Sequence, residues 1–369
     1  MTGPERPWDR PAPELEGQAR PNAAGMGREA LARLLTSLGE KPFRTAQVFE
    51  GLYRHRWADW EDFTMLSKAL RGKLRAAVDL RWPEIVESAS SEDGSTKHAF
   101  RMGDGSLVEG VHMPYEDRAT LCLSSQVGCA MGCTFCATGR MGILRNLTSA
   151  EIAGQVIAML NHHAHPEGKP VNLVFMGMGE PLHNLAHVMD AFALLHDPGG
   201  LAIPPRRVTV STSGLVAGIQ RLATFHPRPR LALSLNATTD ERRSRIMPVN
   251  RVWNLEALAK TLQAFPLNKG ERITLEYVLL KGETDSPEDA KRLAAFAKRF
   301  PSKINLIPFN PHEGAGFEPP DEARINELGS YLSGQGLTIS VRRSRGQDIA
   351  GACGQLARRR REQEAGEED

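Results

Sequence analysis

Between residues 120 and 344, short runs rich in β-branched and aliphatic residues alternate with stretches of helical character. The runs are LCLSS (121–125), VNLVFMG (171–177), RVTVST (207–212), LALSLN (231–236), ITLEYVLL (273–280), KINLIPF (303–309) and LTISVRR (337–343). Strands separated by helices favour a parallel sheet, and six or seven such units predict an α/β fold with a partial (β/α)6 barrel. Thr148-Ser149-Ala150-Glu151 is a capping-box pattern that predicts the start of the first helix. Functional residues are then expected at the carboxyl ends of the strands.

The rest of the chain divides by composition. Residues 1–25 are rich in proline and predict a disordered leader, residues 26–92 a small helical domain, and residues 93–119 a β-hairpin connection. Residues 120–344 are the core, and residues 345–369 are a C-terminal tail that holds Cys353. The leader lacks the apolar segment of a signal peptide and the pattern of a mitochondrial presequence.

Composition excludes several classes of protein. With 46 Lys plus Arg, 44 Asp plus Glu, 41% hydrophobic residues and 5 Cys, the chain is neither a disulfide scaffold nor a disordered or collagen-like protein. No run of about 18 apolar residues indicates a membrane span, so we expect a cytoplasmic protein with no membrane partner. Three of the five cysteines lie within eight residues, which favours a metal cluster or redox chemistry over structural disulfides.

The three clustered cysteines are Cys129, Cys133 and Cys136, directly after the first predicted core strand. Three thiolates on a tight loop can hold three irons of a [4Fe-4S] cluster and leave the fourth iron open to a small molecule. A structural zinc site would want a fourth Cys or His at matching distance, and none follows at the expected spacing. Zinc and unligated thiols are the alternatives.

Polar residues follow several other predicted strands. Gly177-Met178-Gly179-Glu180 comes after the second strand, where glycines allow close approach of a ligand and a carboxylate can bind an ammonium group. Alone, this pattern is equally typical of a packing turn. The strand ends also carry Ser211, Ser234, Leu235, Asn236 and Asn310. Ser and Asn at such places usually cap helices, so the residue types alone leave both interpretations open.

The cysteine spacing strongly resembles that of the radical S-adenosylmethionine (SAM) enzymes, and the Gly-Glu motif resembles their "GGE" motif. A narrower resemblance is to the RlmN/Cfr family of methyltransferases, which act on an adenine of large-subunit ribosomal RNA. It rests on LCLSSQVGCAMGCTFC, RNLTSAEIAGQV, FMGMGEPLHN, RRVTVSTSG, LALSLNA, KINLIPFNP and RRSRGQDIAGACGQLA, in order over about residues 95–357. In LALSLNA, Asn236 stands where the family pattern has His.

The resemblance implies a set of cofactors and ligands. It implies a [4Fe-4S] cluster on Cys129, Cys133 and Cys136, and two SAM molecules per turnover. The residues implied to bind SAM are Gly179, Glu180, Ser211, Ser234, Leu235, Asn236 and Asn310.

The resemblance also implies roles for three residues outside the cysteine loop. Cys353 would accept a methyl group from one SAM, and a 5′-deoxyadenosyl radical from the second would take a hydrogen atom from that methyl group. The methylene radical then adds to the adenine, Glu109 accepts the ring proton, and Cys122 attacks the sulfur of Cys353 to form a transient disulfide as the product leaves. By residue type alone, Cys353, Cys122 and Glu109 are a surface Cys, a buried Cys and an exposed strand carboxylate.

The implied substrates are 23S rRNA, before ribosome assembly, and tRNA, with the target base unstacked. A flavodoxin-type protein would supply electrons, and nothing in the sequence indicates more than a monomer. The long N-terminal part favours RlmN-type methylation at adenine C2. Alternatives are Cfr-type methylation at C8, an inactive RNA-binding paralogue and a glycyl-radical activase.

Two groups of basic residues are candidates for RNA contact. In the helical domain, Arg54, Arg56, Lys68, Arg71, Lys73 and Arg75 are interleaved with Tyr53, Trp57 and Trp60. This pattern fits either a solvated helix surface over core aromatics or phosphate binding. In the core and tail, the candidates for phosphate contact are Arg140, Arg145, Arg342, Arg343 and Arg345.

Overall fold

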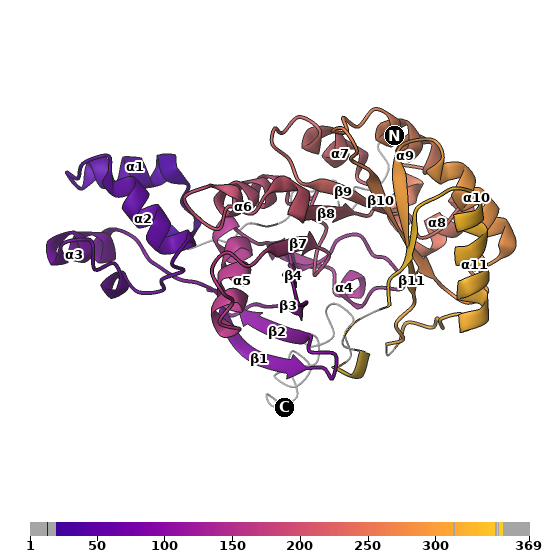
Figure 1. Ribbon diagram of the computed structural model, residues 1–369, viewed down its shortest axis with the longest axis horizontal. Coiled ribbons are helices and arrows are strands. Elements are labelled where there is room, and N and C mark those ends of the chain that lie inside the picture. Colours follow the sequence, from indigo (N-terminus) through magenta and orange to yellow (C-terminus); the bar gives the residue numbers. More distant parts are fainter. Residues whose placement is uncertain (1–12, 14–19, 313, 344, 346, 350–369) are drawn as a thin grey trace.

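The computed structural model describes residues 13, 20–312, 314–343, 345 and 347–349. A small helical domain lies beside a larger α/β unit built on one sheet (Figure 1). Cys353 lies outside the described residues, so its predicted role is not placed by the structure.

The main sheet has ten strands in the order β1-β2-β3-β4-β7-β8-β9-β10-β11-β12. They are β1 (Glu84–Ser90), β2 (Thr96–Arg101), β3 (Leu107–Pro114), β4 (Ala119–Cys122), β7 (Val171–Phe175), β8 (Val208–Thr212), β9 (Arg230–Ser234), β10 (Ile273–Leu279), β11 (Ser302–Pro308) and β12 (Ile339–Val341). Strands β4 and β7 to β12 are parallel neighbours in chain order, and β1 to β4 are antiparallel. The predicted α/β architecture with an open parallel barrel is confirmed.

The two faces of this sheet differ in chemistry. One face is apolar. The strand pairing places six buried side chains on this face: Leu121, Leu173, Val210, Leu233, Leu275 and Leu306. The opposite face carries polar groups, which the same register places in line: Lys97, Glu109, Cys122, Ser211, Ser234, Glu276 and Asn305. Because side chains alternate along a strand, the polar set faces the interior of the partial barrel while the apolar set packs against helices.

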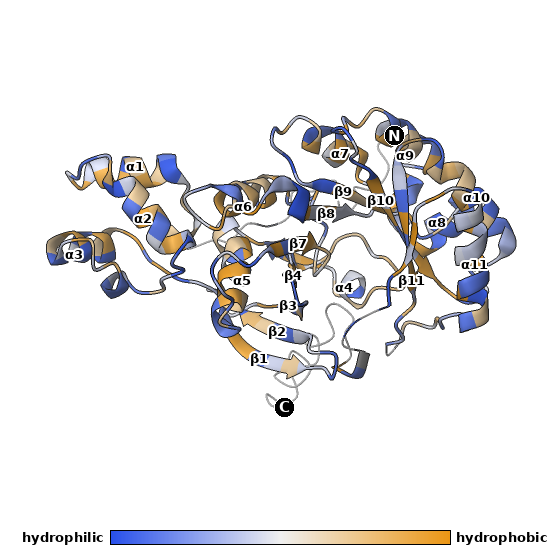
Figure 2. Cartoon of the chain, in the orientation of Figure 1, coloured by the Kyte–Doolittle hydropathy of each residue, from blue (hydrophilic) through white to orange (hydrophobic). Residues whose placement is uncertain are grey.

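Helices lie between successive strands of the α/β unit along the chain. They are α4 (Ala137–Arg140), α5 (Ser149–His162), α6 (Leu185–His196), α7 (Val216–Leu222), α8 (Asp240–Ile246), α9 (Leu255–Gln263), α10 (Pro287–Ala297) and α11 (Glu322–Gly334). The predicted capping box is present, since Glu151 N–H donates to Thr148 Oγ1 and Thr148 N–H donates to Glu151 Oε2. Helix α5 is hydrophobic along most of its length (Figure 2), because it packs against α6 and against the segment Ala23–Gly25 as well as being buried beside Pro83.

The N-terminal domain consists of α1 (Arg28–Ser37), α2 (Arg44–Tyr53) and α3 (Lys68–Ala77) around a core of leucine and aromatic side chains. It docks on the α/β unit through Arg28, whose guanidinium pairs with Asp197 at the end of α6 at 2.7 Å. A second close contact joins Pro83, which follows the three helices, to α5 of the α/β unit. A Cβ added at Gly154 of α5 would lie 2.2 Å from Pro83. The helical domain projects from one side of the α/β unit and contacts it near α5 and α6 (Figure 1).

The structure differs from the sequence expectation at three places. Strand β1 extends the predicted hairpin to three antiparallel strands, although its residues were expected in the helical domain. A second sheet forms from β5 (Gln126–Gly128) and β6 (Ile143–Asn146), which flank the cysteine loop. Ala23 and Ala24, expected in the leader, are buried in a short 3-10 helix against the helical domain.

No helix among the described residues combines the length and the apolar character needed to cross a lipid bilayer.

Candidate functional site

The cysteine loop is closed at its base by the β5–β6 hairpin. Cys129 N–H donates to Gly142 O at 2.7 Å, directly after β5. Gly128 has a φ of 78°, and a Cβ there would lie 2.0 Å from that carbonyl, so only glycine fits. Gly139 of α4 is equally constrained, because an added Cβ would lie 2.8 Å from Cys133 O. The backbone of the loop is therefore held in one compact conformation.

The three thiols of the loop suit a metal cluster. Cys129 and Cys133 are buried and Cys136 is partly buried. Burial raises the pKa of the Cys129 and Cys133 thiols well above the usual value, since the charged thiolate is poorly solvated there. Thiolates at these positions therefore need a strong positive charge beside them, which cluster irons would supply. The donor set of three cysteines fits a [4Fe-4S] cluster with one open iron.

Arg243 is a buried cation near the cysteine loop, and it was not among the residues predicted from the sequence. Arg243 of α8 is fully buried, and burial lowers its pKa to about 10 although the nearby Cys133 opposes that shift. Its guanidinium donates to Leu235 O at 2.9 Å, Ser213 O at 2.6 Å, Ser234 O at 3.2 Å and Asn250 Oδ1 at 3.0 Å. Arg243 therefore ties the ends of β8 and β9 to α8. Nothing in the sequence pointed to it, because Arg243 lies in the charged run DERRSRI (240–246) beside two other arginines.

The Gly-Glu turn packs directly against β5. Gly179 has a φ of 101°, and a Cβ there would lie 2.8 Å from the Gln126 backbone nitrogen. The Gln126 side chain accepts from Glu180 N–H at 2.9 Å and donates to Asn146 Oδ1 at 2.9 Å. The turn and the cysteine loop are thus joined through one buried glutamine, which the sequence did not single out.

The Glu180 carboxylate is buried at the carboxyl end of the sheet. It accepts from Ser213 N–H at 2.7 Å, Ser213 Oγ at 2.9 Å and Leu182 N–H at 3.1 Å. Burial raises its pKa, and the hydrogen bonds from Ser213 and Leu182 counteract this shift. The hydroxyl of Thr212 also contributes to this effect, so the protein holds the Glu180 carboxylate in a fixed orientation at the end of the sheet.

The structure brings Ser211 and Ser234 together, with 3.3 Å between their hydroxyl oxygens at the ends of β8 and β9. Leu235 follows, fully buried, and Asn310 lies half-buried beyond the end of β11. Asn236 adopts a φ of 58°, a left-handed conformation that Asn tolerates better than most residues. Its Oδ1 accepts from Val278 N–H at 3.1 Å, so this side chain also holds β10.

Glu109 and Cys122 lie on the interior face of the sheet, on β3 and β4. Glu109 is buried, and its carboxylate lies 3.8 Å from the buried Lys97 ammonium. Ser124 Oγ donates to Glu109 O and accepts from Met178 N–H, which joins β3 to the Gly-Glu turn. The expectation of an exposed strand carboxylate is wrong, because the antiparallel extension turns Glu109 into the barrel.

A further acid on the same face was missed by sequence reasoning. Glu276 of β10 is buried beside Ser234 in the register, and burial raises its pKa. Asn305 Nδ2 donates to its Oε1 at 2.9 Å, whereas Oε2 has no hydrogen-bond partner among the described residues. The only signal was its position in ITLEYVLL, where it breaks an apolar run. Glu276 is therefore a polar group that faces the interior and is available to a ligand.

The basic candidates for phosphate contact separate into paired and exposed residues. Arg145 is buried and forms bidentate pairs with Asp104 and Glu151 at 2.7–2.9 Å, so it is a structural residue and the phosphate interpretation is wrong for it. Arg343 pairs with Glu322. Arg140 is exposed at the end of α4 and stays a candidate.

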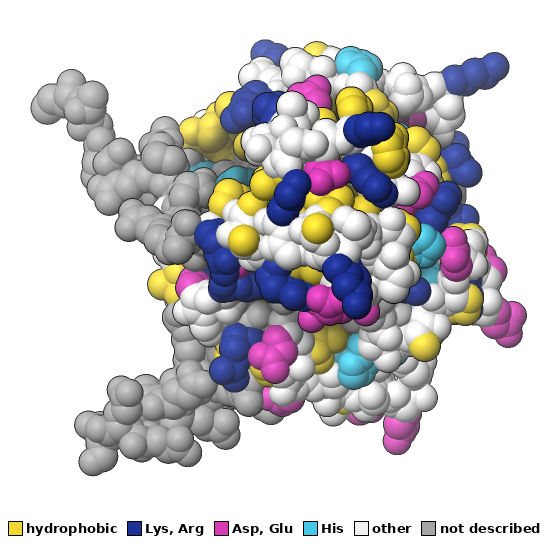
Figure 3. All heavy atoms as spheres, turned by 90° about the vertical axis from the view of Figure 1, so that its left-hand side faces the viewer, with side chains coloured by type: hydrophobic (Ala, Val, Ile, Leu, Met, Phe, Trp, Pro, Cys, Tyr) yellow, Lys and Arg dark blue, Asp and Glu magenta, His cyan; other side chains and the backbone are white. Residues whose placement is uncertain are grey.

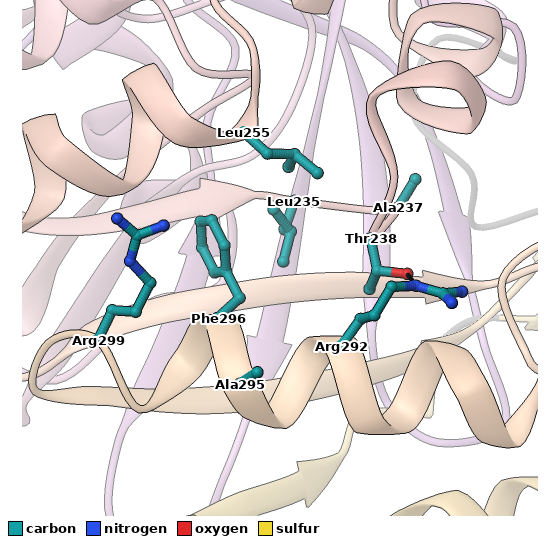
Figure 4. A pocket seen from close by; sticks show the side chains of 8 residues that line it. All are labelled: Leu235, Ala237, Thr238, Leu255, Arg292, Ala295, Phe296 and Arg299. Carbon is teal, nitrogen blue, oxygen red and sulfur yellow. Dashed lines mark hydrogen bonds between the residues drawn. The ribbon is translucent and has the colours of Figure 1, made fainter.

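A cavity of about 260 Å³ opens away from these residues, between the loop after β9 and helices α9 and α10. Figure 4 shows its lining, in which Arg292 and Arg299 stand at opposite ends of Phe296. Both arginines are already paired, Arg292 with Asp289 and Arg299 with Glu256. Of the predicted ligands only Leu235 lines it, so this cavity is separate from the candidate site.

Comparison with known families matches two regions. Residues 123–294 match the family described as the Radical SAM superfamily. Residues 21–80 match the N-terminal domain of the ribosomal RNA large subunit methyltransferase. The first match covers the cysteine loop and the Gly-Glu turn, and the second covers the helical domain.

Individual proteins match along nearly the whole chain. The dual-specificity RNA methyltransferase RlmN 2 of Myxococcus xanthus is 45% identical over 361 residues, 96% of this chain and 95% of its own length. The dual-specificity RNA methyltransferase RlmN of Geobacter sulfurreducens is 47% identical over 90% of this chain and 91% of its own length. A crystal structure of a radical SAM methyltransferase from Sphaerobacter thermophilus superimposes with a TM-score of 0.87 at 39% identity, covering 91% of this chain and 98% of that one.

Proposed function

The chain belongs to the RlmN family of the radical SAM superfamily, and on this premise we propose that it methylates carbon 2 of adenine in 23S rRNA and in tRNA. The observation that carries the proposal is the match to RlmN proteins at 44–47% identity across both the helical domain and the α/β unit. A radical SAM enzyme with another substrate would share the α/β unit alone.

The family implies a [4Fe-4S] cluster and SAM, and the described residues fit both. Cys129, Cys133 and Cys136 would hold the cluster, and together the cluster and SAM supply a carbon radical able to act on an unreactive C–H bond. The Glu180 carboxylate would bind the SAM ammonium group. Ser211 and Ser234, at the ends of β8 and β9, would hold other polar atoms of SAM. The use of two SAM molecules per turnover is part of the proposal.

Three residues would carry the methyl transfer. Cys353 would accept the methyl group, Glu109 would remove the adenine ring proton, and Cys122 would release the product by forming a disulfide with Cys353. The positions of Cys122 and Glu109 on the interior face support this assignment, since β3 and β4 are adjacent. Adenine C2 has no lone pair that could attack a methyl group directly, which is why a radical route is needed.

The helical domain would contribute to RNA binding. Lys and Arg side chains gather across the middle of the face that this domain presents in Figure 3. The exposed Lys68, Lys73 and Arg75 of α3 would contact phosphates. Lys73 would then leave its surface pair with Glu40, and Arg75 its pairs with Asp59 and Glu61. Tyr53 and Trp60 are buried in the domain core, so they are unsuited to stacking on bases.

Adenine C2 is preferred to C8 because the relatives carry the RlmN name and share the helical domain. An inactive paralogue is disfavoured because Cys122, Cys353, Glu109 and the cluster cysteines are all present. A flavodoxin-type electron donor, a cytoplasmic location and a monomeric state stay predictions.

The covalent step is tested by peptide mass spectrometry after incubating the cluster-loaded protein with methyl-labelled SAM and a reductant. We expect the label as S-methylcysteine at Cys353 and no label at Cys122. The Cys122→Ala variant should accumulate a covalent RNA–protein adduct, whereas Cys353→Ala should form none. Full turnover by Cys353→Ala, or a label on another residue, would overturn the assignment.

A further inference from the structure

Five of the chain's 11 histidines gather where the end of α5 meets the antiparallel strands. His98 is fully buried on β2, His162 is the exposed last residue of α5, and His163 follows it as the cap. His112 of β3 stacks on His163 with 3.8 Å between ring centroids. His165, the fifth, is buried in the loop after α5.

Three of these rings present nitrogens to one point. One ring nitrogen from each of His98, His162 and His163 lies within 4.8 Å of the others. The Nε2 atoms of His98 and His163 are 2.8 Å apart. Three imidazoles on one zinc ion, with Zn–N distances of about 2.0–2.1 Å, have nitrogens roughly 3.3 Å apart. To reach this geometry, the nitrogens of His98 and His163 would move slightly apart, and the exposed His162 ring would move slightly closer to them. These small movements convert the cluster into a three-histidine site.

Neighbouring side chains orient the ring nitrogens of His98 and His163. His98 Nδ1 lies 2.8 Å from Ser88 Oγ of β1, a contact that directs Nε2 toward the other two rings. Hydrogen bonds of this kind to the second ring nitrogen commonly orient metal-binding histidines. The stacked His112 ring limits rotation of His163, and His112 Nδ1 is buried with no hydrogen-bond partner among the described residues.

The cluster is distinct from the cysteine site. His98 and His112 project from the face of the sheet that α5 covers, opposite to Lys97 and Glu109 on the same two strands. The cysteine loop lies near the start of α5, and the histidines lie at its end, about 20 Å away for a helix of 14 residues.

We propose that His98, His162 and His163 bind one zinc ion, which ties the end of α5 to strand β2. Imidazole nitrogens without carboxylate or thiolate neighbours suit zinc among the common divalent ions, and Mg²⁺ or Ca²⁺ would require oxygen ligands. Because His162 is exposed, water completes the coordination. The ion acts structurally: it fixes β2, whose opposite face carries Lys97 beside Glu109 of β3.

The test uses full-length protein without a polyhistidine tag, with its iron–sulfur cluster loaded so that the cysteines are occupied. After stripping with a chelator and dialysis against zinc, the protein should retain about one zinc per chain. X-ray absorption at the zinc edge should show nitrogen or oxygen ligands at about 2.0 Å with imidazole scattering, and no sulfur at about 2.3 Å.

Zinc retention by single-residue variants distinguishes binding at the three histidines from adventitious zinc binding elsewhere on the protein. His162→Ala, at an exposed position, should weaken zinc binding by more than about a hundredfold, and Ser88→Ala by about tenfold. His55→Ala, an exposed histidine of the helical domain, is the matched control and should retain the ion. No retained zinc, sulfur in the first coordination shell, or equal retention by His162→Ala would overturn the proposal.

Discussion

Replacing Arg145 with methionine should destabilise the fold by about 3–5 kcal/mol, without acting through RNA. The side chain is 7% exposed, and it pairs with Glu151 at the start of α5 and with Asp104 at the β2–β3 turn, which are 9% and 31% exposed. Two unit charges about 4 Å apart attract by about 4 kcal/mol at an effective dielectric constant of about 20. Methionine would fill much of the volume but leave a buried carboxylate without a cation, which typically costs 3–5 kcal/mol.

The assay is urea unfolding and thermal melting of the cluster-loaded protein, with iron content matched between variants. At roughly 2 °C per kcal/mol for a chain of this size, the melting midpoint should fall by about 6–10 °C. The triple variant Arg145→Met, Glu151→Gln and Asp104→Asn removes all three charges together. It should recover much of the loss, because no buried charge is then left unpaired.

Measurements of RNA binding distinguish a structural role of Arg145 from a contact with phosphate. A residue that contacts phosphate contributes to the salt dependence of RNA binding. Its removal lowers the slope of log K against log salt concentration by about one, and it leaves the stability of the fold unchanged. If Arg145→Met unfolds within about 0.5 kcal/mol of the unmodified protein and binds RNA with a shallower salt dependence, the structural assignment of Arg145 is refuted.

Two further predictions concern the histidines and the Gly-Glu turn. Burial lowers the pKa of His98 to about 3 and of His112 to about 4, below the unfolded value near 6.5. The unfolding free energy of zinc-free protein should therefore be constant above about pH 7.5 and be lower by about 1.4 kcal/mol for each histidine at pH 5.5. His98→Gln should flatten this profile in fluorescence-monitored urea titrations, and an unchanged profile would contradict the assignment. Gly179→Ala should abolish SAM binding in equilibrium dialysis, because its φ of 101° is strained for alanine and the new Cβ would meet the Gln126 backbone. Tight SAM binding by this variant would show that the turn can rearrange.

The parallel strands were predictable from the sequence because each is a short buried run between helices. Ile273–Leu279 and Ser302–Pro308 lie within two residues of the runs from which they were predicted. Strand β1 was not predictable, since Glu84–Ser90 is mostly polar and its pairing with β2 supplies the order. The β5–β6 hairpin was missed because its strands, of three and four residues, are held by the cysteine loop between them.

Local motifs in the site were easier to find than their supporting residues. The cysteine spacing and the Gly-Glu turn are contiguous in sequence, so their chemistry could be predicted directly. Arg243 and Gln126 act through partners far along the chain, at Ser213 and at Glu180, and no local pattern reveals such contacts. Arg145 was misread for the same reason, because its two carboxylate partners are visible only after folding.

Methylation of adenine C2 can be detected by mass spectrometry of nucleosides from 23S rRNA and tRNA. Both RNAs should come from cells lacking adenine-C2 methylation and be incubated with the cluster-loaded protein, SAM and a reductant. We expect 2-methyladenosine in both RNAs, and none with the Cys353→Ala variant. Formation of 8-methyladenosine in place of 2-methyladenosine, or no methyladenosine in either RNA, would contradict this expectation.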